Sequence, residues 1–238
     1  MSIGIKIIFY MKKKNKILFI CRHNDVWSNQ IVKLLKKNFS NITIFYSKTY
    51  NQKITKKILN WSGDYILSFR SLLILSERIL SKAKIAAINF HPGPPKYRGV
   101  GCLNYAIFNN EKFYGVTAHL MTKEVDYGEI LKVQTFKINK IHNLDNILDI
   151  THRKLFLLTK YIIERIIKNK LDINKLIKLN NYSWSKKIKF KSDLENFYRI
   201  NKNITKKKLQ NKLRATITKK FKPYIVIHNK KFYIENEN

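Results

Sequence analysis

The chain has 238 residues, of which 45% are hydrophobic, and its formal net charge is +33. That length supports one ordinary hydrophobic core plus an appendage, and no uncharged run reaches the roughly 18 residues that would span a bilayer. The basic residues are nearly all lysines and are spread along the chain, without a basic helix that carries interleaved aromatic residues. We therefore expect a generally basic surface that favours a phosphorylated small molecule, no specific nucleic-acid partner and no membrane association.

The first half of the chain alternates between apolar strand patterns and helical patterns. Strands are predicted at 17–20, 42–46, 64–69 and 85–88, and helices at 53–61, at 76–83 and around Ile31, Leu34 and Leu35. This alternation predicts an α/β layered domain. Arg22 and Ser28 lie between the first strand and its helix, where helix N–H groups and a cation can hold a phosphate. An ordinary surface arginine and a helix cap, at Asp25 or Ser28, explain this junction equally well.

Three of the four prolines and three of the seven glycines fall within residues 92–101. Asn89 and His91 stand just before this loop, two residues apart, so a strand that reaches them places both on one face. Pro92 ends the strand, because it has no N–H for the ladder and restricts His91 to extended geometry. An amide and an imidazole at the carboxyl end of a strand, before a rigid loop, mark a candidate active site.

A second strand is expected to bring an acid to the same edge. Residues 114–121 alternate like a strand, and the turn Asp126–Gly128 follows them. Asp126 could therefore return beside Asn89 and His91. We expect His119, on this strand, to be a core histidine, with support of the site as the alternative.

The remainder of the chain predicts a strand at 129–137 and a long amphipathic helix at 143–169. His152, on that helix, is expected to be a surface residue. After a boundary near residue 180, short helices are predicted at 193–200 and 205–214. Residues 224–227 and 231–234 then alternate around His228–Lys230, which predicts a hairpin with Asn229 at positive φ.

Cysteine usage and the N-terminus give further expectations. Cys21 and Cys102 have neither metal-site spacing nor the number needed for a disulfide framework, so we expect a reducing, cytoplasmic location and no metal. Residues 1–10 are apolar, but lysines follow them instead of a small-residue cleavage site. We expect these ten residues to be dispensable, with Met11 as an alternative start.

Three stretches together, Asn89–Gly99, Gly115–His119 and Asp126–Gly128, resemble the folate-dependent formyltransferase family. That family includes glycinamide ribonucleotide, methionyl-tRNA and sugar N-formyltransferases. Its catalytic Asn, His and Asp correspond to Asn89, His91 and Asp126. The longer run that ends at Cys102 looks most like the branch that formylates nucleotide-linked amino sugars.

The resemblance implies a Rossmann-like formyltransferase domain, a mixed and mostly parallel sheet flanked by helices, over residues 17–180. An extension over residues 1–16 would precede it, and a small C-terminal α+β appendage over residues 181–238 would end in the hairpin. Dimers are common in the family, so a homodimer is a further expectation. A route to lipopolysaccharide O antigen follows from the family alone.

The resemblance also implies the substrates and their contacts. The formyl donor would be 10-formyltetrahydrofolate, and the acceptor a dTDP- or GDP-linked 3-amino or 4-amino dideoxy sugar. The contacts assigned to folate are Phe69, Leu72, Ile74 and Asp126, and those assigned to the acceptor are Arg22, Ser28, Tyr97 and Arg98.

Formyl transfer is an acyl transfer and needs a donor for the oxyanion and an acceptor for the amine proton. Asn89 and protonated His91 can donate to the oxyanion, and His91 or Asp126 can accept the proton; no metal is required. Two alternatives remain. A methionyl-tRNA formyltransferase ranks second, because the chain is short for that enzyme's larger C-terminal barrel. A non-catalytic folate- or nucleotide-binding relative ranks third, because each chemical role has its residue.

Overall fold

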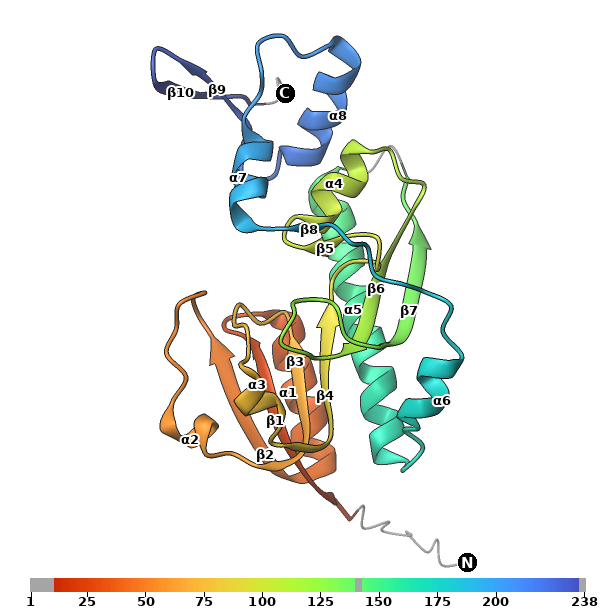
Figure 1. Cartoon of the computed structure of the whole chain (residues 1–238). Coiled ribbons are helices and arrows are strands. Elements are labelled where there is room, and N and C mark those ends of the chain that lie inside the picture. Colours follow the sequence, from red (N-terminus) through yellow and green to blue (C-terminus); the bar gives the residue numbers. More distant parts are fainter. Residues whose placement is uncertain (1–10, 140–142, 236–238) are drawn as a thin grey trace, which may run out of the picture.

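A computed structural model describes residues 11–139 and 143–235; the prediction for residues 1–10 falls outside these ranges. Six strands form the central sheet in the order β2-β1-β3-β4-β6-β7 (Figure 1). The first four are parallel, and β6 and β7 are antiparallel to their neighbours. The predicted mixed, mostly parallel sheet is therefore confirmed. The strand bounds are β1 Lys13–Arg22, β2 Phe39–Ser47, β3 Gly63–Phe69, β4 Ala83–His91, β6 Phe113–Leu120 and β7 Ile130–Lys137.

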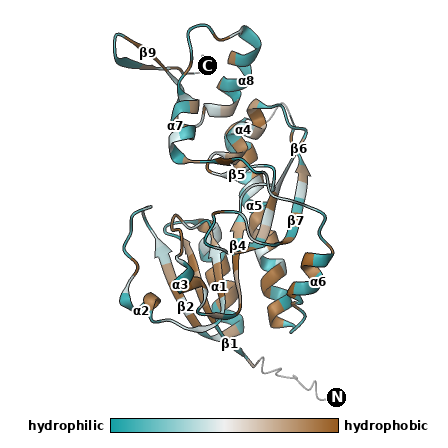
Figure 2. Ribbon diagram, viewed as in Figure 1, coloured by the Kyte–Doolittle hydropathy of each residue, from teal (hydrophilic) through white to brown (hydrophobic). Residues whose placement is uncertain are grey.

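Both faces of the sheet are buried. Side chains of successive strand residues point to opposite faces, so each strand contributes to two hydrophobic cores, one on each side of the sheet. In β1, Ile17 and Phe19 pack against the helices α1 (Val26–Asn38) and α5 (Leu144–Ile167), whereas Leu18 faces the other core. That second face is covered by two single-turn helices, α2 (Lys56–Leu59) and α3 (Glu77–Leu80), and their connections. Figure 2 shows hydrophobic residues along several strands and on parts of the helices, and hydrophilic residues in most of the loops.

Helix α1 begins where the sequence allowed either of two caps. Asp25 is the cap, since its Oδ2 accepts the backbone N–H of Ser28 at 2.8 Å. The predicted helices at 53–61 and 76–83 are shorter than expected. The first ends at Asn60, which has a non-helical backbone, and the second ends before Ala83, which opens β4 beside Gly63.

The long helix α5 confirms the predicted amphipathic segment and provides a stability test. Leu155 is 0% exposed beneath the sheet, whereas Leu157, on the same helix, is 40% exposed. Leu155→Ala should lower the free energy of unfolding by about 2–5 kcal/mol, because it removes buried methyl groups and leaves a cavity. Leu157→Ala should cost less than about 1 kcal/mol. Urea unfolding followed by circular dichroism measures both, and equal losses would place α5 outside the core.

The C-terminal region packs on the loop that follows β4. Its elements are β8 Ile188–Lys189, α7 Lys191–Tyr198, α8 Lys206–Thr216, β9 Tyr224–Ile227 and β10 Lys230–Tyr233. The helix α6 (Ile173–Lys178) precedes them and packs on β7. Strand β8 pairs in parallel with β5 (Arg98–Gly99), and α8 packs against α4 (Cys102–Phe108) with the start of α5 (Figure 1). Neither this two-residue ladder nor α6 was predicted.

The closing hairpin, β9 and β10, confirms the predicted one. His228 and Asn229 both have positive φ, 46° and 59°, as a two-residue hairpin turn requires. Among the described helices, none is both long and apolar enough to cross a membrane.

Candidate active site

A cavity of about 370 Å³ opens at the carboxyl ends of the parallel strands. It lies close to the switch between β1 and β3, from which the chain builds outward in both directions. Arg22 at the end of β1, Ser68 and Arg70 at the end of β3, and Asn89 and His91 at the end of β4 all line it. The structure therefore brings together side chains that are far apart in the sequence.

Strand β4 continues through His91 and positions the two predicted side chains. Asn89 is opposite His119 of β6, and His91 is opposite Thr117, so both lie on one face. Asn89 is half-buried, whereas His91 is only 3% exposed. The predicted strand end at Pro92 is confirmed.

The Asp126 turn closes the group. Asp126 has a φ of 48°, a left-handed conformation that aspartate tolerates better than most residues. A Cβ on Gly128 would lie 1.9 Å from the Leu120 carbonyl oxygen, so only glycine allows the turn to fold back onto β6. The turn places Asp126 Oδ2 3.1 Å from His91 Nδ1, and the same oxygen accepts the Gly99 N–H at 3.1 Å.

His91 faces an acceptor with each of its ring nitrogens. Nδ1 meets the Asp126 carboxylate, and Nε2 lies 2.9 Å from the carbonyl oxygen of Tyr97. Both nitrogens must therefore donate, which requires the imidazolium form. Burial lowers the pKa of His91, but the charge of Asp126 and the neighbouring Cys102 raise it well above its ordinary value of 6.5. Burial by itself raises the pKa of Asp126, yet the charge of His91 lowers it well below its ordinary value.

We expect His91 to keep both ring protons at neutral pH. In ¹⁵N NMR spectra, both ring nitrogens should stay in the protonated range from about pH 5 to pH 8. The Asp126→Asn variant should lose this behaviour, since the paired charge is gone while the burial remains. A wild-type His91 that titrates near 6.5 would contradict the ion pair.

The two shifts also determine how stability depends on pH. Because the folded pKa of His91 is raised, its contribution is complete below about 6.5 and is lost only as pH rises through the raised value. Because the folded pKa of Asp126 is lowered, its contribution is present above 3.8 and is lost as pH falls through the lowered value. The pair thus stabilises the fold across the neutral range.

His119 has both of the roles considered from the sequence: it is a core histidine, and it contacts residues of the candidate site. It is a buried histidine of β6, and its Nε2 is 3.1 Å from Asn89 Nδ2 and 3.4 Å from Asp126 Oδ1. Its Nδ1–H donates to the Leu120 carbonyl at 2.7 Å, which leaves Nε2 to accept from the Asn89 amide. His119 therefore fixes the orientation of Asn89.

A cationic cluster lines the cavity beside this group. Arg70 Nη1 donates to Asp25 Oδ1 at 2.5 Å, and Arg22 stands next to them. His152 reaches the same cavity from α5, so the prediction of a surface residue was wrong. Burial and the positive charge of Arg70 lower the pKa of His152 to about 3, so its imidazole is neutral at pH 7.

The structure places three predicted acceptor contacts away from the cavity lining. Ser28 is fully buried, and its hydroxyl donates to Asp25 Oδ2 at 2.6 Å, so it supports the α1 cap. The Tyr97 hydroxyl donates to Glu111 at 2.8 Å. Arg98 donates to the Ser185 and Val125 carbonyls and stacks 4.4 Å above the ring of Tyr127. Of the four predicted acceptor contacts, only Arg22 lines the cavity.

The predicted folate contacts divide in a similar way. Leu72 and Ile74 line an apolar wall of the cavity together with Leu75 and Met121, whereas Phe69 is fully buried in the core beneath it. No group of three or more His, Cys, Asp or Glu side chains within the described ranges could hold a metal ion.

Comparison with known proteins gives the family. A model of the family described as "Formyl transferase" matches residues 10–165, more than half of the chain. The chain belongs to the formyl transferase family. The bifunctional polymyxin resistance protein ArnA of Wigglesworthia glossinidia brevipalpis is 34% identical over 167 residues, which cover 66% of this chain and 25% of that protein. Methionyl-tRNA formyltransferases also match, over shorter stretches.

Solved structures share the fold over nearly the whole chain. A sugar N-formyltransferase from Shewanella sp. is 20% identical, with a TM-score of 0.74, over 93% of this chain and 97% of that one. An N-formyltransferase from Helicobacter canadensis, solved with folinic acid and dTDP-3-aminofucose, is 23% identical, with a TM-score of 0.68, over 91% and 86%. The formyl transferase fold therefore extends into the C-terminal region.

Trp184 contacts this site, although no local pattern in the sequence marks it as a site residue. The indole Nε1–H of Trp184 donates to the Gly128 carbonyl at 2.7 Å. Its ring meets the rings of His119 and His91 edge-on, at centroid distances of 4.9 and 5.9 Å. The segment after α6 thus covers the buried side of the histidines.

Proposed function

We propose that this chain transfers the formyl group of 10-formyltetrahydrofolate to the amine of a nucleotide-linked amino sugar, acting in the cytoplasm. The meeting of Asn89, His91 and Asp126 at one end of the cavity carries the proposal. An amide donor, a buried imidazolium and a carboxylate supply the groups that acyl transfer to an amine requires.

Asn89 is the group proposed to bind the formyl oxygen as negative charge develops on it. Its Nδ2 lies 3.1 Å from His119 Nε2, an ordinary hydrogen-bond distance, and 3.4 Å from Asp126 Oδ1, a long one. Nδ2 can give up the long hydrogen bond to Asp126 and donate instead to an oxygen atom of a ligand in the cavity. His119 holds the amide in place during that exchange.

His91 and Asp126 have different proposed tasks. His91 already donates with both nitrogens, so it cannot accept a proton; its fixed positive charge stabilises negative charge nearby. Asp126 Oδ1 is then the acceptor available for the proton that the attacking amine loses. Asp126 also orients His91 through its other oxygen. Because the donor nitrogen loses its bond to the formyl carbon, this proton must finally be transferred to that nitrogen.

The apolar wall suits the proposed donor, which supplies the formyl group when it is bound. Leu72, Ile74 and Met121 offer a nonpolar surface for a flat ring, beside the polar groups at the end of β4. Ile74 is 72% exposed, so its side chain is available to contact a ligand.

The cationic side of the cavity suits the phosphates of the proposed acceptor. Arg22 is exposed there, and Arg70 is held by Asp25 with its guanidinium at the cavity. Tyr50 lines the same cavity and offers a ring for the base. The Helicobacter protein, which was solved with a dTDP-linked amino sugar, gives the proposal its substrate class.

A transfer assay tests the proposal against its rivals. Purified full-length chain is given 10-formyltetrahydrofolate with either a panel of nucleotide-linked amino sugars or initiator methionyl-tRNA. We expect turnover of an amino sugar and none of the tRNA. Turnover of the tRNA alone would favour methionyl-tRNA formylation, for which the charge of +33 and the matched methionyl-tRNA enzymes argue. Folate binding without either turnover would indicate a non-catalytic relative.

A further inference from the structure

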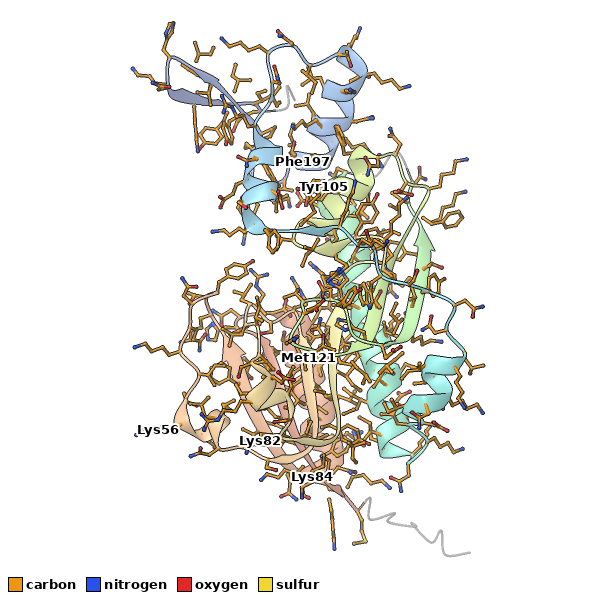
Figure 3. All side chains as sticks on the ribbon, viewed as in Figure 1. Lys56, Lys82, Lys84, Tyr105, Met121 and Phe197 are labelled. Carbon is orange, nitrogen blue, oxygen red and sulfur yellow. The ribbon has the colours of Figure 1, made fainter. Side chains whose placement is uncertain are left out.

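A second hollow, of about 540 Å³, lies where α4 meets α7 and β8, and it shares no lining residue with the catalytic cavity. Its volume is within the range of small-molecule sites. Figure 3 shows Tyr105 of α4 beside Phe197 of α7 at this junction. The proposed transfer reaction does not use the hollow.

Aromatic rings form one side of the hollow. Phe197 packs between Tyr105, at a centroid distance of 4.8 Å, and Phe108, at 5.3 Å. All three rings are only partly buried, although they are large and apolar. The ammonium groups of Lys189 and Lys212 lie over the Tyr105 and Phe197 rings, at 5.1 and 4.9 Å from the ring centres. A flat aromatic ligand would stack on these rings by displacing such flexible lysine side chains.

Positive charges form another side. Lys187 and Lys189 line the hollow from the β8 segment, and the ammonium of Lys189 lies 5.1 Å from the centre of the Tyr105 ring. Within the described ranges, neither lysine forms an ion pair. Lys96 also lines the hollow, but Glu111 binds its ammonium. Asp193 is a second carboxylate near the hollow, because burial and then the charge of Asp193 raise the pKa of Tyr105.

We propose that this hollow is a second binding site, separate from the catalytic cavity, for a nucleoside diphosphate. The base would stack on the Tyr105–Phe197 rings, and the phosphates would bind Lys187 and Lys189. The rings and the ammonium groups are neighbours. They should therefore bind a ligand that contains both an aromatic base and an anion more tightly than they bind the base or the anion alone.

Tyr97 gives the site a connection to the chemistry. It lines the hollow, and its carbonyl oxygen accepts the hydrogen bond from His91 Nε2 in the neighbouring cavity. A ligand in the hollow therefore contacts the residue that holds one side of the His91 ring. The site is placed to sense or adjust the catalytic loop.

Charge reversal at two adjacent lysines provides the test. Lys186 and Lys187 are both exposed, but only Lys187 lines the hollow. Calorimetric titration of the full chain with dTDP should show two classes of site. Lys187→Glu should weaken one class at least tenfold, Phe197→Leu should weaken the same class, and Lys186→Glu should leave both unchanged. Thermal unfolding checks that each variant folds.

Mapping where the nucleotide binds tests this proposal independently of the proposed reaction. A photoreactive dUDP analogue should label Tyr105 or Phe197 in peptide maps, whether or not the chain transfers formyl groups. Titration with thymidine and with pyrophosphate shows which half of the ligand binds. A single class of site that Lys187→Glu does not weaken, no label in the hollow, or equal loss in the Lys186 and Lys187 variants would each overturn the proposal. A single class that Lys187→Glu weakens would instead count against nucleotide binding in the catalytic cavity, and equal loss would indicate general attraction to a basic surface.

Discussion

Replacing Asp126 by asparagine is expected to lower kcat/KM for formyl transfer by about 10³-fold while the chain stays folded. The substitution preserves the shape of the side chain but removes the negative charge that holds His91 as an imidazolium. It also removes the proposed proton acceptor. An amide nitrogen at the Oδ2 position would oppose both the donating Nδ1 of His91 and the Gly99 N–H, so it would have to take the Oδ1 position, where it cannot accept a proton. A steady-state formyl-transfer assay measures the loss.

Asp172 provides a matched control for this variant. Its carboxylate caps α6 by accepting the Lys175 N–H, far from the cavity lining. Asp172→Asn should retain near-normal kcat/KM. Raising the pH should not rescue Asp126→Asn, since deprotonation of His91 only removes more of the charge that stabilises the reaction. Near-normal turnover by Asp126→Asn would refute its assignment.

Asn89→Ala is expected to lower kcat by about 10²–10³-fold, with a much smaller change in KM. The reason is that its Nδ2–H is proposed to bind the formyl oxygen most strongly once that oxygen carries charge. An interaction made only in the transition state affects kcat rather than substrate affinity. Asn89→Asp should be at least as damaging, because it adds a second carboxylate beside Asp126.

The control for Asn89 is Asn41→Ala on β2. The amide of Asn41 donates to the Lys14 carbonyl at an exposed position, so its loss tests only the general effect of removing an asparagine. Stopped-flow measurement of a single turnover separates the chemical step from substrate binding. A variant of Asn89 with normal kcat and raised KM would instead make the residue a binding group.

The Asn89–His91–Asp126 arrangement was predictable because local sequence encodes each part of it. Strand alternation places Asn89 and His91 on one face, Pro92 ends the strand, and a strand followed by an Asp-x-Gly turn returns Asp126. Tertiary contacts decide the rest. Nothing near His152 in the sequence distinguishes it from a surface residue of an amphipathic helix, and only the packing of α5 brings it to the cavity.

For two of the predicted acceptor contacts, the residue type suggested ligand binding, whereas the structure shows hydrogen bonds within the protein. Ser28 and Arg98 have the residue types that bind phosphate, but other parts of the protein already use their hydrogen-bonding groups. Ser28 is taken up by Asp25, and Arg98 by two carbonyls, one of them 87 residues away in sequence. Such long-range partners leave no trace in a local pattern. The β5–β8 ladder is equally invisible, since two residues are too few to show alternation.

The segment around Trp184 also determines when the site becomes complete as the chain is synthesised. Asn89, His91 and Asp126 leave the ribosome well before Trp184, whose indole holds the Gly128 carbonyl, and before Ser185, whose carbonyl holds Arg98. A nascent chain that ends between α5 and β8 therefore carries all three side chains without the segment that covers them. Truncated products of translation should therefore lack the proposed formyl transfer and consume no formyl donor.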